Sequence, residues 1–544
     1  MKVRDARCMK SVAALALLLV PGEFKAADAP TTRPPPAQFQ TSDRCMACHN
    51  GLVAPGGEDI SIGFDWRASI MANSSRDPYW QASVRREALD HPQAIRKIED
   101  ECSDCHAPIT RYEARSHGKL GAVFEHLPVD RRSESSRKFI DGVSCSLCHQ
   151  ISGQKLGTPE SFNAGFVIEP AESGVHPEYG PYDIHGGRQR IMRSSSAGFE
   201  PTRGDHIRRS ELCATCHTLY TEALGAEGAP IGRFPEQVPY QEWLHSDFRD
   251  KKSCQDCHMP RVQGDLLISR VLGERRPELS RHSFVGANFF MQRMLNRYRE
   301  ELDVIAEPAE LSRAADYTSQ YLQNEAAEVR IDRITRVAGR LEVEVRVVNL
   351  GGHKLPTAYP SRRAWLHFVV RDDAHRTIFE SGALHRDGSI EGNDNDTDAA
   401  RFEPHYREIN NRSQVQIYEP ILRDQNGAVT TGLLSAVGYL KDNRVLPRGF
   451  DKRTADPDTA VIGEAMQDPG FGGGSHRVLY SIDIDAVRTP VQVQVELWYQ
   501  PVGYRWANNL KRYDAAEPRR FTGYFDSMSG SASELLARAK AVAF

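Results

Sequence analysis

Five copies of one pattern, Cys-x-x-Cys-His, run through the first half of this 544-residue chain. Two cysteines three positions apart can form thioethers to the two vinyl groups of one haem, and the adjacent histidine can then ligate its iron. Ten of the eleven cysteines lie inside these motifs. The pattern predicts five covalent haems c, attached at Cys45, Cys48 and His49; Cys102, Cys105 and His106; Cys145, Cys148 and His149; Cys213, Cys216 and His217; and Cys254, Cys257 and His258.

Other uses of paired cysteines fit the pattern poorly. A zinc site needs four ligands per metal and does not require a histidine after every second cysteine. A thioredoxin-like pair occurs once, beside a βαβ pattern that this sequence lacks. A disulfide framework would place cysteines at other spacings. Covalent haem attachment is therefore the interpretation we adopt.

The N-terminus has the features of a secretory signal peptide. Residues 1–29 combine a basic start, an apolar run over residues 12–20 and a stretch of small residues, and they contain the remaining cysteine, Cys8. The apolar run is too short to cross a bilayer, and no later segment is long and apolar enough to do so. We therefore predict a periplasmic protein, or one exported further to the outer membrane or the cell exterior, without a transmembrane anchor after signal removal.

The rest of the chain divides into two contrasting parts. Residues 30–40 form a proline-rich leader, and residues 41–325 read as a pentahaem domain of loops and short helices with little strand alternation. Residues 326–505 show period-two alternation, which indicates a β-sandwich. The predicted fold class is α+β multidomain, a mainly α and irregular multihaem cytochrome domain followed by a β-sandwich domain. Residues 506–544 form a tail with a short helix at residues 533–542.

Particular elements are expected within these parts. Helices are predicted at residues 92–101, 288–302 and 310–322, where apolar residues follow helical spacing. Strands are predicted at residues 329–334, 341–347, 364–371, 414–418, 478–484 and 491–499.

An iron that only carries electrons needs a sixth ligand, and four residues are candidates for this distal position. His206 lies seven residues before Cys213, His282 precedes a predicted helix after the last motif, and His353 follows two glycines at the end of a predicted strand. Met71 could also ligate an iron and raise its potential. The alternatives are an ordinary loop histidine in each of the three cases and a core methionine for Met71.

The haem-bearing half resembles the multihaem cytochrome c superfamily that includes the nitrosomonad tetrahaem cytochrome and hydroxylamine oxidoreductase. The resemblance rests on residues 71–78, 141–149, 211–218 and 254–260. Residues 352–365 and 439–450 are similar to a subset of bacterial multihaem cytochromes with a C-terminal β-domain. The resemblance implies that histidines placed like His206, His282 and His353 act as distal ligands.

Two functions from different classes remain open. The favoured one is an electron-transfer protein, whose closely spaced and mostly bis-histidine haems pass electrons between other redox proteins, either cytochromes or quinol-linked membrane complexes. The alternative is an oxidoreductase that acts on a small nitrogen or sulfur compound at one five-coordinate haem. Pentahaem nitrite reductases usually carry lysine in place of one motif histidine, whereas all five motifs here end in histidine. A formal net charge of −4 gives no electrostatic indication of nucleic-acid binding.

An acidic loop at residues 387–398 invites comparison with a calcium site. Asp394, Asp396 and Asp398 have the opening alternation of an EF-hand. Ala399 stands where that loop needs glycine, and His405 stands where it needs glutamate. We therefore expect a solvated loop.

Overall fold

The computed structural model describes residues 38–544, except for residues 197, 226 and 488. The predicted signal peptide and residues 30–37 of the proline-rich leader lie outside the described residues. One compact unit spans Ala37–Phe544, so the haem-motif part and the β-rich part belong to the same unit. In the described part of the chain, no helix combines the length and the apolarity that crossing a membrane would require.

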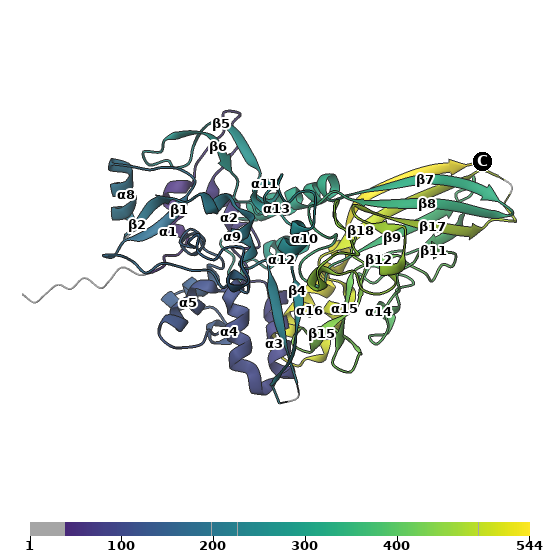
Figure 1. The fold of residues 1–544 in the computed structure, drawn as a ribbon, viewed down its shortest axis with the longest axis horizontal. Helices are drawn as coiled ribbons and strands as arrows, with labels where there is room; N and C mark the ends of the chain where they lie inside the picture. The colour runs from purple at the N-terminus through teal and green to yellow at the C-terminus, as the bar shows by residue number, and fades with distance from the viewer. Residues whose placement is uncertain (1–37, 197, 226, 488) are drawn as a thin grey trace, which may run out of the picture. The chain divides into compact units, whose positions relative to one another are not determined.

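Short helices dominate the part of the chain that carries the motifs (Figure 1). The predicted helices at residues 92–101, 288–302 and 310–322 are confirmed by α4, α12 and α13, with shifted ends. The helices up to residue 321 are α1 (Asp43–His49), α2 (Ile62–Arg67), α3 (Pro78–Asp90), α4 (Ile95–His106), α5 (Pro108–Ser116), α6 (Glu134–Ile140), α7 (Cys145–Cys148), α8 (Gly187–Ser195), α9 (Ser210–Ala214), α10 (Pro239–Leu244), α11 (Cys254–His258), α12 (Phe289–Arg297) and α13 (Pro308–Tyr321).

This part also contains more strand than its sequence suggested. Three two-stranded sheets interrupt the helices: β1 (His176–Gly180) with β2 (Phe199–Arg203), β3 (Leu219–Leu224) with β4 (Pro230–Gln237), and β5 (Arg261–Leu267) with β6 (Arg275–Ser280). Most of these strands are half-exposed and lack a strict alternation of apolar and polar residues, which explains why the sequence pattern did not reveal them.

The second half of the chain forms a β-sandwich. One sheet has the order β10-β9-β18-β19 with β12 paired to β9, and the other has the order β11-β17-β8-β7 with β16 paired to β17. The rings of Phe368 on β9 and Tyr480 on β17 stack with centroids 3.8 Å apart, which joins the two sheets face to face. The strands are β7 (Ala327–Val337), β8 (Arg340–Asn349), β9 (Arg363–Arg371), β10 (Thr377–Ser381), β11 (Glu408–Ile409), β12 (Ile417–Tyr418), β16 (Phe471–Gly472), β17 (Ser475–Asp483), β18 (Val491–Gln500) and β19 (Glu534–Ala543).

Alternating side chains build the core of the sandwich. On β8, Leu341, Val343, Val345 and Val347 are fully buried, as the period-two pattern predicts for one face of a sheet. Five predicted strands are confirmed as β7, β8, β9, β17 and β18, and the sixth shortens to β12. A further sheet of β13 (Pro420–Asp424), β14 (Val429–Thr430) and β15 (Ala436–Asp442) lies outside the two main sheets. The mixed α and β character of the predicted fold is confirmed.

The prediction of a helix at residues 533–542 was wrong. This segment is β19, which pairs antiparallel with β18 along almost its whole length. The alanine-rich sequence has high helix propensity, but the open edge of β18 supplies hydrogen-bond partners for alternate residues of the extended segment. The tail instead has its helices earlier, at α15 (Tyr504–Asn509) and α16 (Ala516–Met528).

Polar contacts join the tail and the β-rich part to the haem-motif part. Arg85 of α3 forms a bidentate ion pair with Glu517 of α16, at 2.8 and 3.0 Å. The Glu87 carboxylate accepts hydrogen bonds from the backbone nitrogens of Leu433 and Leu434. A π-turn at Leu322–Ala326 leads directly from α13 into β7. The domain boundary between residues 325 and 326 stays a prediction.

Candidate haem-binding cavity

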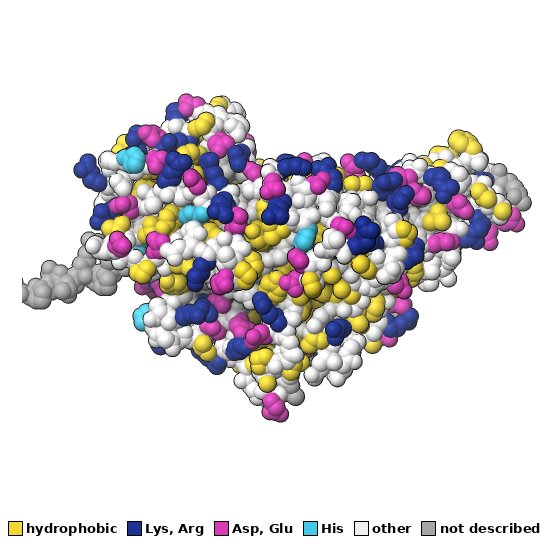
Figure 2. Space-filling model, viewed as in Figure 1, with side chains coloured by type: hydrophobic (Ala, Val, Ile, Leu, Met, Phe, Trp, Pro, Cys, Tyr) yellow, Lys and Arg dark blue, Asp and Glu magenta, His cyan; other side chains and the backbone are white. Residues whose placement is uncertain are grey.

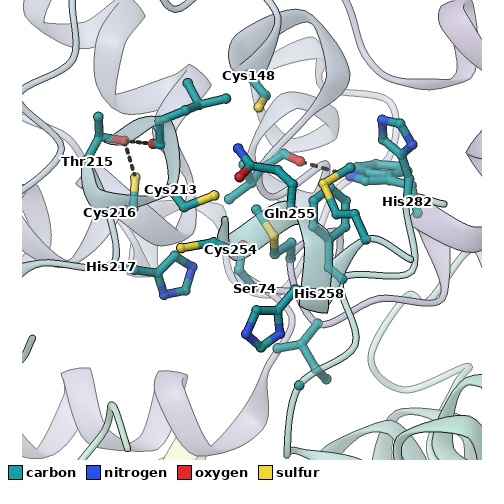
Figure 3. Close-up of a pocket in the computed structure, with 18 of the residues that line it drawn as sticks. Ser74, Cys148, Cys213, Thr215, Cys216, His217, Cys254, Gln255, His258 and His282 are labelled. Carbon is teal, nitrogen blue, oxygen red and sulfur yellow. Dashed lines mark hydrogen bonds between the residues drawn. The ribbon is translucent and has the colours of Figure 1, made fainter. Parts of the chain in front are cut away.

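One cavity of about 1700 Å³ is lined by residues of all five motifs. This volume exceeds the few hundred to roughly 1,000 Å³ of a pocket for one small molecule. All ten motif thiols are free of disulfide bonds. In Figure 3, Cys148, Cys213, Cys216 and Cys254, which come from three motifs, lie around one space together with His217, His258 and His282. The fold therefore gathers all fifteen predicted attachment residues around one cavity.

Each motif lies on or beside a short helix. Residues at positions i, i+3 and i+4 of a helix share one face, so both thiols and the histidine can point to the same side. Two of these helices begin at serine caps: the Ser144 side chain accepts from Leu147 N, and Ser253 forms a capping box with Asp256. The caps fix where each motif helix starts, and hence the direction in which its cysteines project.

Four of the five motif histidines donate their Nδ1 proton to a backbone carbonyl. The distances are 2.6 Å from His49 to Ile268, 2.9 Å from His106 to Ser74, 2.6 Å from His149 to Tyr179 and 2.5 Å from His258 to Val285. A proton on Nδ1 leaves the Nε2 lone pair free for a metal, which is the usual arrangement around metal-bound histidines. The backbone thus selects the ligand-competent tautomer.

Burial keeps these rings neutral. It lowers the pKa of His106 and of His217 to about 4, and it also lowers the pKa of His49, His149 and His258. A neutral imidazole is the form that binds a metal, so no proton has to be displaced near neutral pH.

Two motif histidines face a second imidazole across the cavity. The ring centroids of His149 and His282 lie 6.2 Å apart with planes at 20°, and those of His258 and His353 lie 6.3 Å apart with planes at 16°. Since a metal–imidazole bond is about 2 Å long, two rings that share one metal ion have centroids roughly 6 Å apart. Both pairs therefore leave room for one iron between the rings.

The two distal rings of these pairs are themselves oriented by backbone carbonyls. His282 Nδ1 donates to Ser280 O and His353 Nδ1 donates to Lys354 O, each at 3.0 Å. Burial lowers the pKa of His282 to about 3. Two of the four predicted distal candidates thus have a ligand-like geometry.

A buried ionic network holds the loop that carries His353. Lys354 is fully buried, and its ammonium lies 2.7 Å from Asp442. Glu242 of α10 accepts hydrogen bonds from Lys354 N at 3.0 Å and from the Thr357 hydroxyl at 2.5 Å, and it pairs with Arg444. The side-chain amide of Asn349 also donates to the His353 carbonyl. These contacts fix a β-sandwich loop against the haem-motif part.

The other three motif histidines have different neighbours. Trp80 stacks on His106 with centroids 4.5 Å apart and planes at 5°, a contact that no motif in the sequence indicates. After burial and His258, the charge of Arg362 is among the causes that lower the pKa of His217. Within residues 38–544, apart from the three gaps, no second imidazole lies parallel to His49, His106 or His217 at the spacing of the two pairs.

The remaining two distal candidates differ in position. Met71 lines the cavity and follows α2 in a turn rather than on a helix. His206 does not line the cavity: its Nε2 donates to the Ile151 carbonyl at 2.8 Å, and its ring packs edge-on against Tyr179. His206 therefore lies near the third motif but does not line the cavity, and both residues stay predictions as ligands.

Thiols from different motifs lie side by side. Cys145 and burial raise the pKa of Cys45, Cys216 and burial raise that of Cys105, and Cys254 and burial raise that of Cys213. Burial and then Cys216 raise the pKa of Cys148 to about 12. These contacts place the first motif beside the third, and the fourth motif beside the second, third and fifth.

The cavity wall also contains buried polar atoms without partners among the described residues. Glu178 Oε1 and the Tyr499 hydroxyl are two of them. Burial raises the pKa of Glu178 well above its ordinary value, and the neighbouring Cys145 adds to this effect. Buried polar groups are normally hydrogen-bonded, so these atoms indicate that the cavity holds a partly polar group. Free thiols, neutral histidines and unpartnered polar atoms together fit haem c.

A second histidine cluster lies in the β-sandwich, where His405, Asp468 and His476 are buried with their ligand atoms close together. Asp468 Oδ2 lies 2.9 Å from His405 Nε2 and 3.1 Å from His476 Nε2. The amides of Gln416 and Asn443 donate to His405 Nδ1, because their oxygens accept from backbone nitrogens. His405 must then carry its proton on Nε2, which leaves no lone pair there for a metal. The cluster is a hydrogen-bonded core network.

The acidic loop at residues 387–398 is likewise occupied by protein contacts. Asp396 is buried and forms a bidentate ion pair with Arg363, at 2.7 and 3.0 Å. Its oxygens are therefore directed to a guanidinium. The expectation of a solvated loop was wrong for this part of the segment, because Asn393, Asn395 and Asp396 are buried.

Comparison with known proteins identifies the fold. The chain is similar to the crystal structure of a penta-haem cytochrome c552 from Thermochromatium tepidum, with a TM-score of 0.53 and 14% sequence identity; the match covers 93% of this chain and 100% of that chain. The two proteins share a fold. No family model matches the sequence, and no curated protein matches it. The resemblance to the hydroxylamine oxidoreductase superfamily stays a prediction.

Proposed function

We propose that this chain is a multihaem c-type cytochrome that holds five haems covalently and transfers electrons between redox partners. The convergence of all five Cys-x-x-Cys-His motifs on one cavity carries the proposal. The shared fold with a penta-haem cytochrome c552 supports it. When bound, haem supplies a one-electron couple at its iron, and the protein sets the potential through ligands, hydrogen bonds and burial.

The cysteines and the histidines of the motifs have different roles in binding each haem. The two cysteines of each motif would attach the ring, and the proximal iron ligands would be His49, His106, His149, His217 and His258. His282 would ligate the same iron as His149, and His353 the same iron as His258, because their rings have the required spacing and tautomer. Met71 remains a candidate for one of the other three positions.

The contacts between cysteines of different motifs indicate which of the five haems would be neighbours. The first motif neighbours the third through Cys45 and Cys145, and the third neighbours the fourth through Cys148 and Cys216. The fourth also neighbours the second and the fifth. A haem at every motif would therefore lie beside at least one other haem, and the haem at the fourth motif would lie beside those of the second, third and fifth motifs. This connected arrangement suits electron transfer across the protein.

The compartment and the partners belong to the same proposal. A signal peptide at residues 1–29 and covalent haem attachment both favour the periplasm or a site further out. Exchange partners of the proposed class are cytochromes or quinol-linked membrane complexes.

One observation favours the second candidate function, an oxidoreductase for a small nitrogen or sulfur compound. Arg362 lines the cavity close enough to His217 to lower its pKa, after burial and His258. The half-buried guanidinium of Arg362 can bind a small anion beside an iron that lacks a strong distal ligand. His217 would be the proximal residue of that site.

Visible and electron paramagnetic resonance spectra of the ferric protein separate the two functions. Electron transfer predicts mostly low-spin irons, little binding of carbon monoxide and negligible turnover of nitrite or hydroxylamine. One stoichiometric high-spin iron together with rapid nitrite reduction would transfer the assignment to the oxidoreductase.

A further inference from the structure

A small exposed apolar patch borders the haem cavity next to the first motif. Leu272 is 60% exposed, Val271 is 47% exposed and Ile191 of α8 is 39% exposed, and all three also line the cavity. We call these three residues the first-motif patch. Exposed apolar side chains that occur together commonly mark a contact surface.

Backbone contacts connect the patch to the first motif. The carbonyl of Ile268 accepts the Nδ1 proton of His49, and the backbone nitrogen of Arg270 donates to the Cys48 carbonyl at 2.9 Å. Arg188 of α8 donates to the Leu272 carbonyl at 2.8 Å, which ties the helix to the same loop. The loop that displays the patch is therefore also the loop that orients the proximal histidine.

Leu272 has a backbone conformation that costs free energy. Its φ is +50°, in the left-handed region that leucine rarely adopts. Burial of the side chain does not offset this cost, because Leu272 is mostly exposed. Unfavourable backbone geometry of this kind is typically retained where a displayed side chain has a role.

Arginines surround the patch. Arg190 and Arg270 are exposed, and no carboxylate in the described part of the chain forms an ion pair with either side chain. Arg188 and Arg193 of the same helix pair with Glu274 and Glu200. Figure 2 shows Lys and Arg side chains interspersed with Asp and Glu side chains over the region of α8, β5 and β6. The first-motif patch, with the unpaired Arg190 and Arg270 beside it, is complementary to a protein surface that carries acidic residues.

We propose that the first-motif patch is the docking surface for a small acidic electron-transfer protein, which exchanges electrons with the first-motif haem. The proposal rests on the proposed function. The first motif suits this role because the loop that displays the patch also contacts His49 and Cys48 through the backbone of Ile268 and Arg270. In each exchange one ferrous iron of this chain gives one electron to one ferric iron of the partner.

The test mixes the haem-loaded protein, reduced beforehand, with a ferric monohaem cytochrome c in a stopped-flow instrument. The carrier is used in two forms: unmodified, with a basic surface, and with its lysines succinylated, which makes it acidic. We expect the acidic form to be reduced faster at low ionic strength, and salt to remove the advantage.

Charge-reversal variants locate the surface. The double variant Arg190→Glu/Arg270→Glu should slow reduction of the acidic carrier about tenfold at low salt and accelerate that of the basic one. Arg333→Glu on β7 is the matched control, because Arg333 is exposed and lies on a strand of the β-sandwich. It should leave both rates unchanged.

Leu272→Gly gives a test that is independent of charge. Glycine adopts a positive φ without strain, so the variant should keep or raise the thermal midpoint of unfolding. Loss of the apolar contact should nevertheless slow reduction of the acidic carrier severalfold at high salt as well as at low salt.

The outcomes separate failure of the docking surface from failure of the proposed function. If the protein reduces either carrier but the rates are indifferent to both the patch variants and the carrier charge, the docking proposal is overturned and electron transfer stands. If the five-haem protein reduces neither carrier, the proposed function itself fails. If the patch variants alter only binding to vesicles of anionic lipid, the surface contacts a membrane and the docking proposal is again overturned.

Discussion

The imidazole rings of His258 and His353 lie 6.3 Å apart with their planes at 16°. His258 ends α11 in the haem-motif part, whereas His353 lies in the loop that follows β8 of the sandwich. If one iron joins the two rings, the β-sandwich is part of the redox unit rather than an independent module. The ionic contacts of Glu242 and Lys354 would then serve to hold a ligand in place.

His353→Ala should convert one low-spin iron to high spin and shift its midpoint potential, because a distal nitrogen is lost. The measurement is electron paramagnetic resonance of the ferric protein, combined with a redox titration. His282→Ala should do the same for a different haem.

His206→Ala is the matched control for these variants. His206 donates its Nε2 proton to Ile151 and lies off the cavity, so the spectrum and all five potentials should match those of the parent. If the spectrum of His353→Ala is unchanged, His353 is an ordinary loop residue and not an iron ligand. If His206→Ala instead shows a high-spin iron, His206 is a ligand, as the sequence predicted.

Glu242→Gln should lower the free energy of unfolding by about 3 kcal/mol, because it leaves a buried guanidinium with one fewer carboxylate. It should also raise the high-spin fraction of the haem beneath His353, since the loop loses an anchor. Denaturant unfolding and the ferric spectrum measure the two effects. Glu391→Gln, on the exposed pair with His385, should change stability by less than about 0.5 kcal/mol. A stable variant with an unaltered spectrum would show that Glu242 does not position the ligand.

Glu496 should make the sandwich sensitive to acid. Burial raises its pKa, but hydrogen bonds from His367, Trp498 and Arg538 more than offset this and bring it to about 2, from an ordinary value of 4.5. A depressed pKa contributes stability that is complete above pH 4.5 and is lost as pH falls towards 2. The contribution is on the order of 2 kcal/mol.

The measurement is the thermal midpoint of unfolding as a function of pH. Glu496→Gln should have a lower thermal midpoint than the parent at neutral pH. The difference between the two midpoints should become smaller as pH falls from 4.5 to 2. The exposed Glu408→Gln should follow the parent at every pH. If the difference between the two thermal midpoints does not change with pH, the Glu496 carboxylate is not the source of the acid sensitivity.

Local patterns in the sequence predicted much of this molecule. The attachment residues are contiguous in each motif, and the alternation along residues 341–347 and 491–499 marks strands directly. The strand at Glu534–Ala543 was missed because its inward positions are mostly alanines, which carry little apolar signal. The exposed Arg538 and Lys540 alternate with those alanines, and this period could have revealed it.

Tertiary relationships were beyond the sequence. The first motif lies beside the third, and the second beside the fourth, so the order along the chain does not give the order in space. Nothing in the sequence linked Trp80 to His106, or distinguished His206 from His282 as a ligand. These distinctions depend on which backbone carbonyl each ring meets after folding.

The central claim is that five motifs hold five haems covalently, and intact mass of the denatured mature protein tests it most directly. Thioethers survive denaturation, so the mass should equal that of the processed chain plus five haems, and Cys148→Ala should weaken one attachment while four remain. A mass that shows fewer than five additions, from cells with complete cytochrome c maturation, would contradict the account.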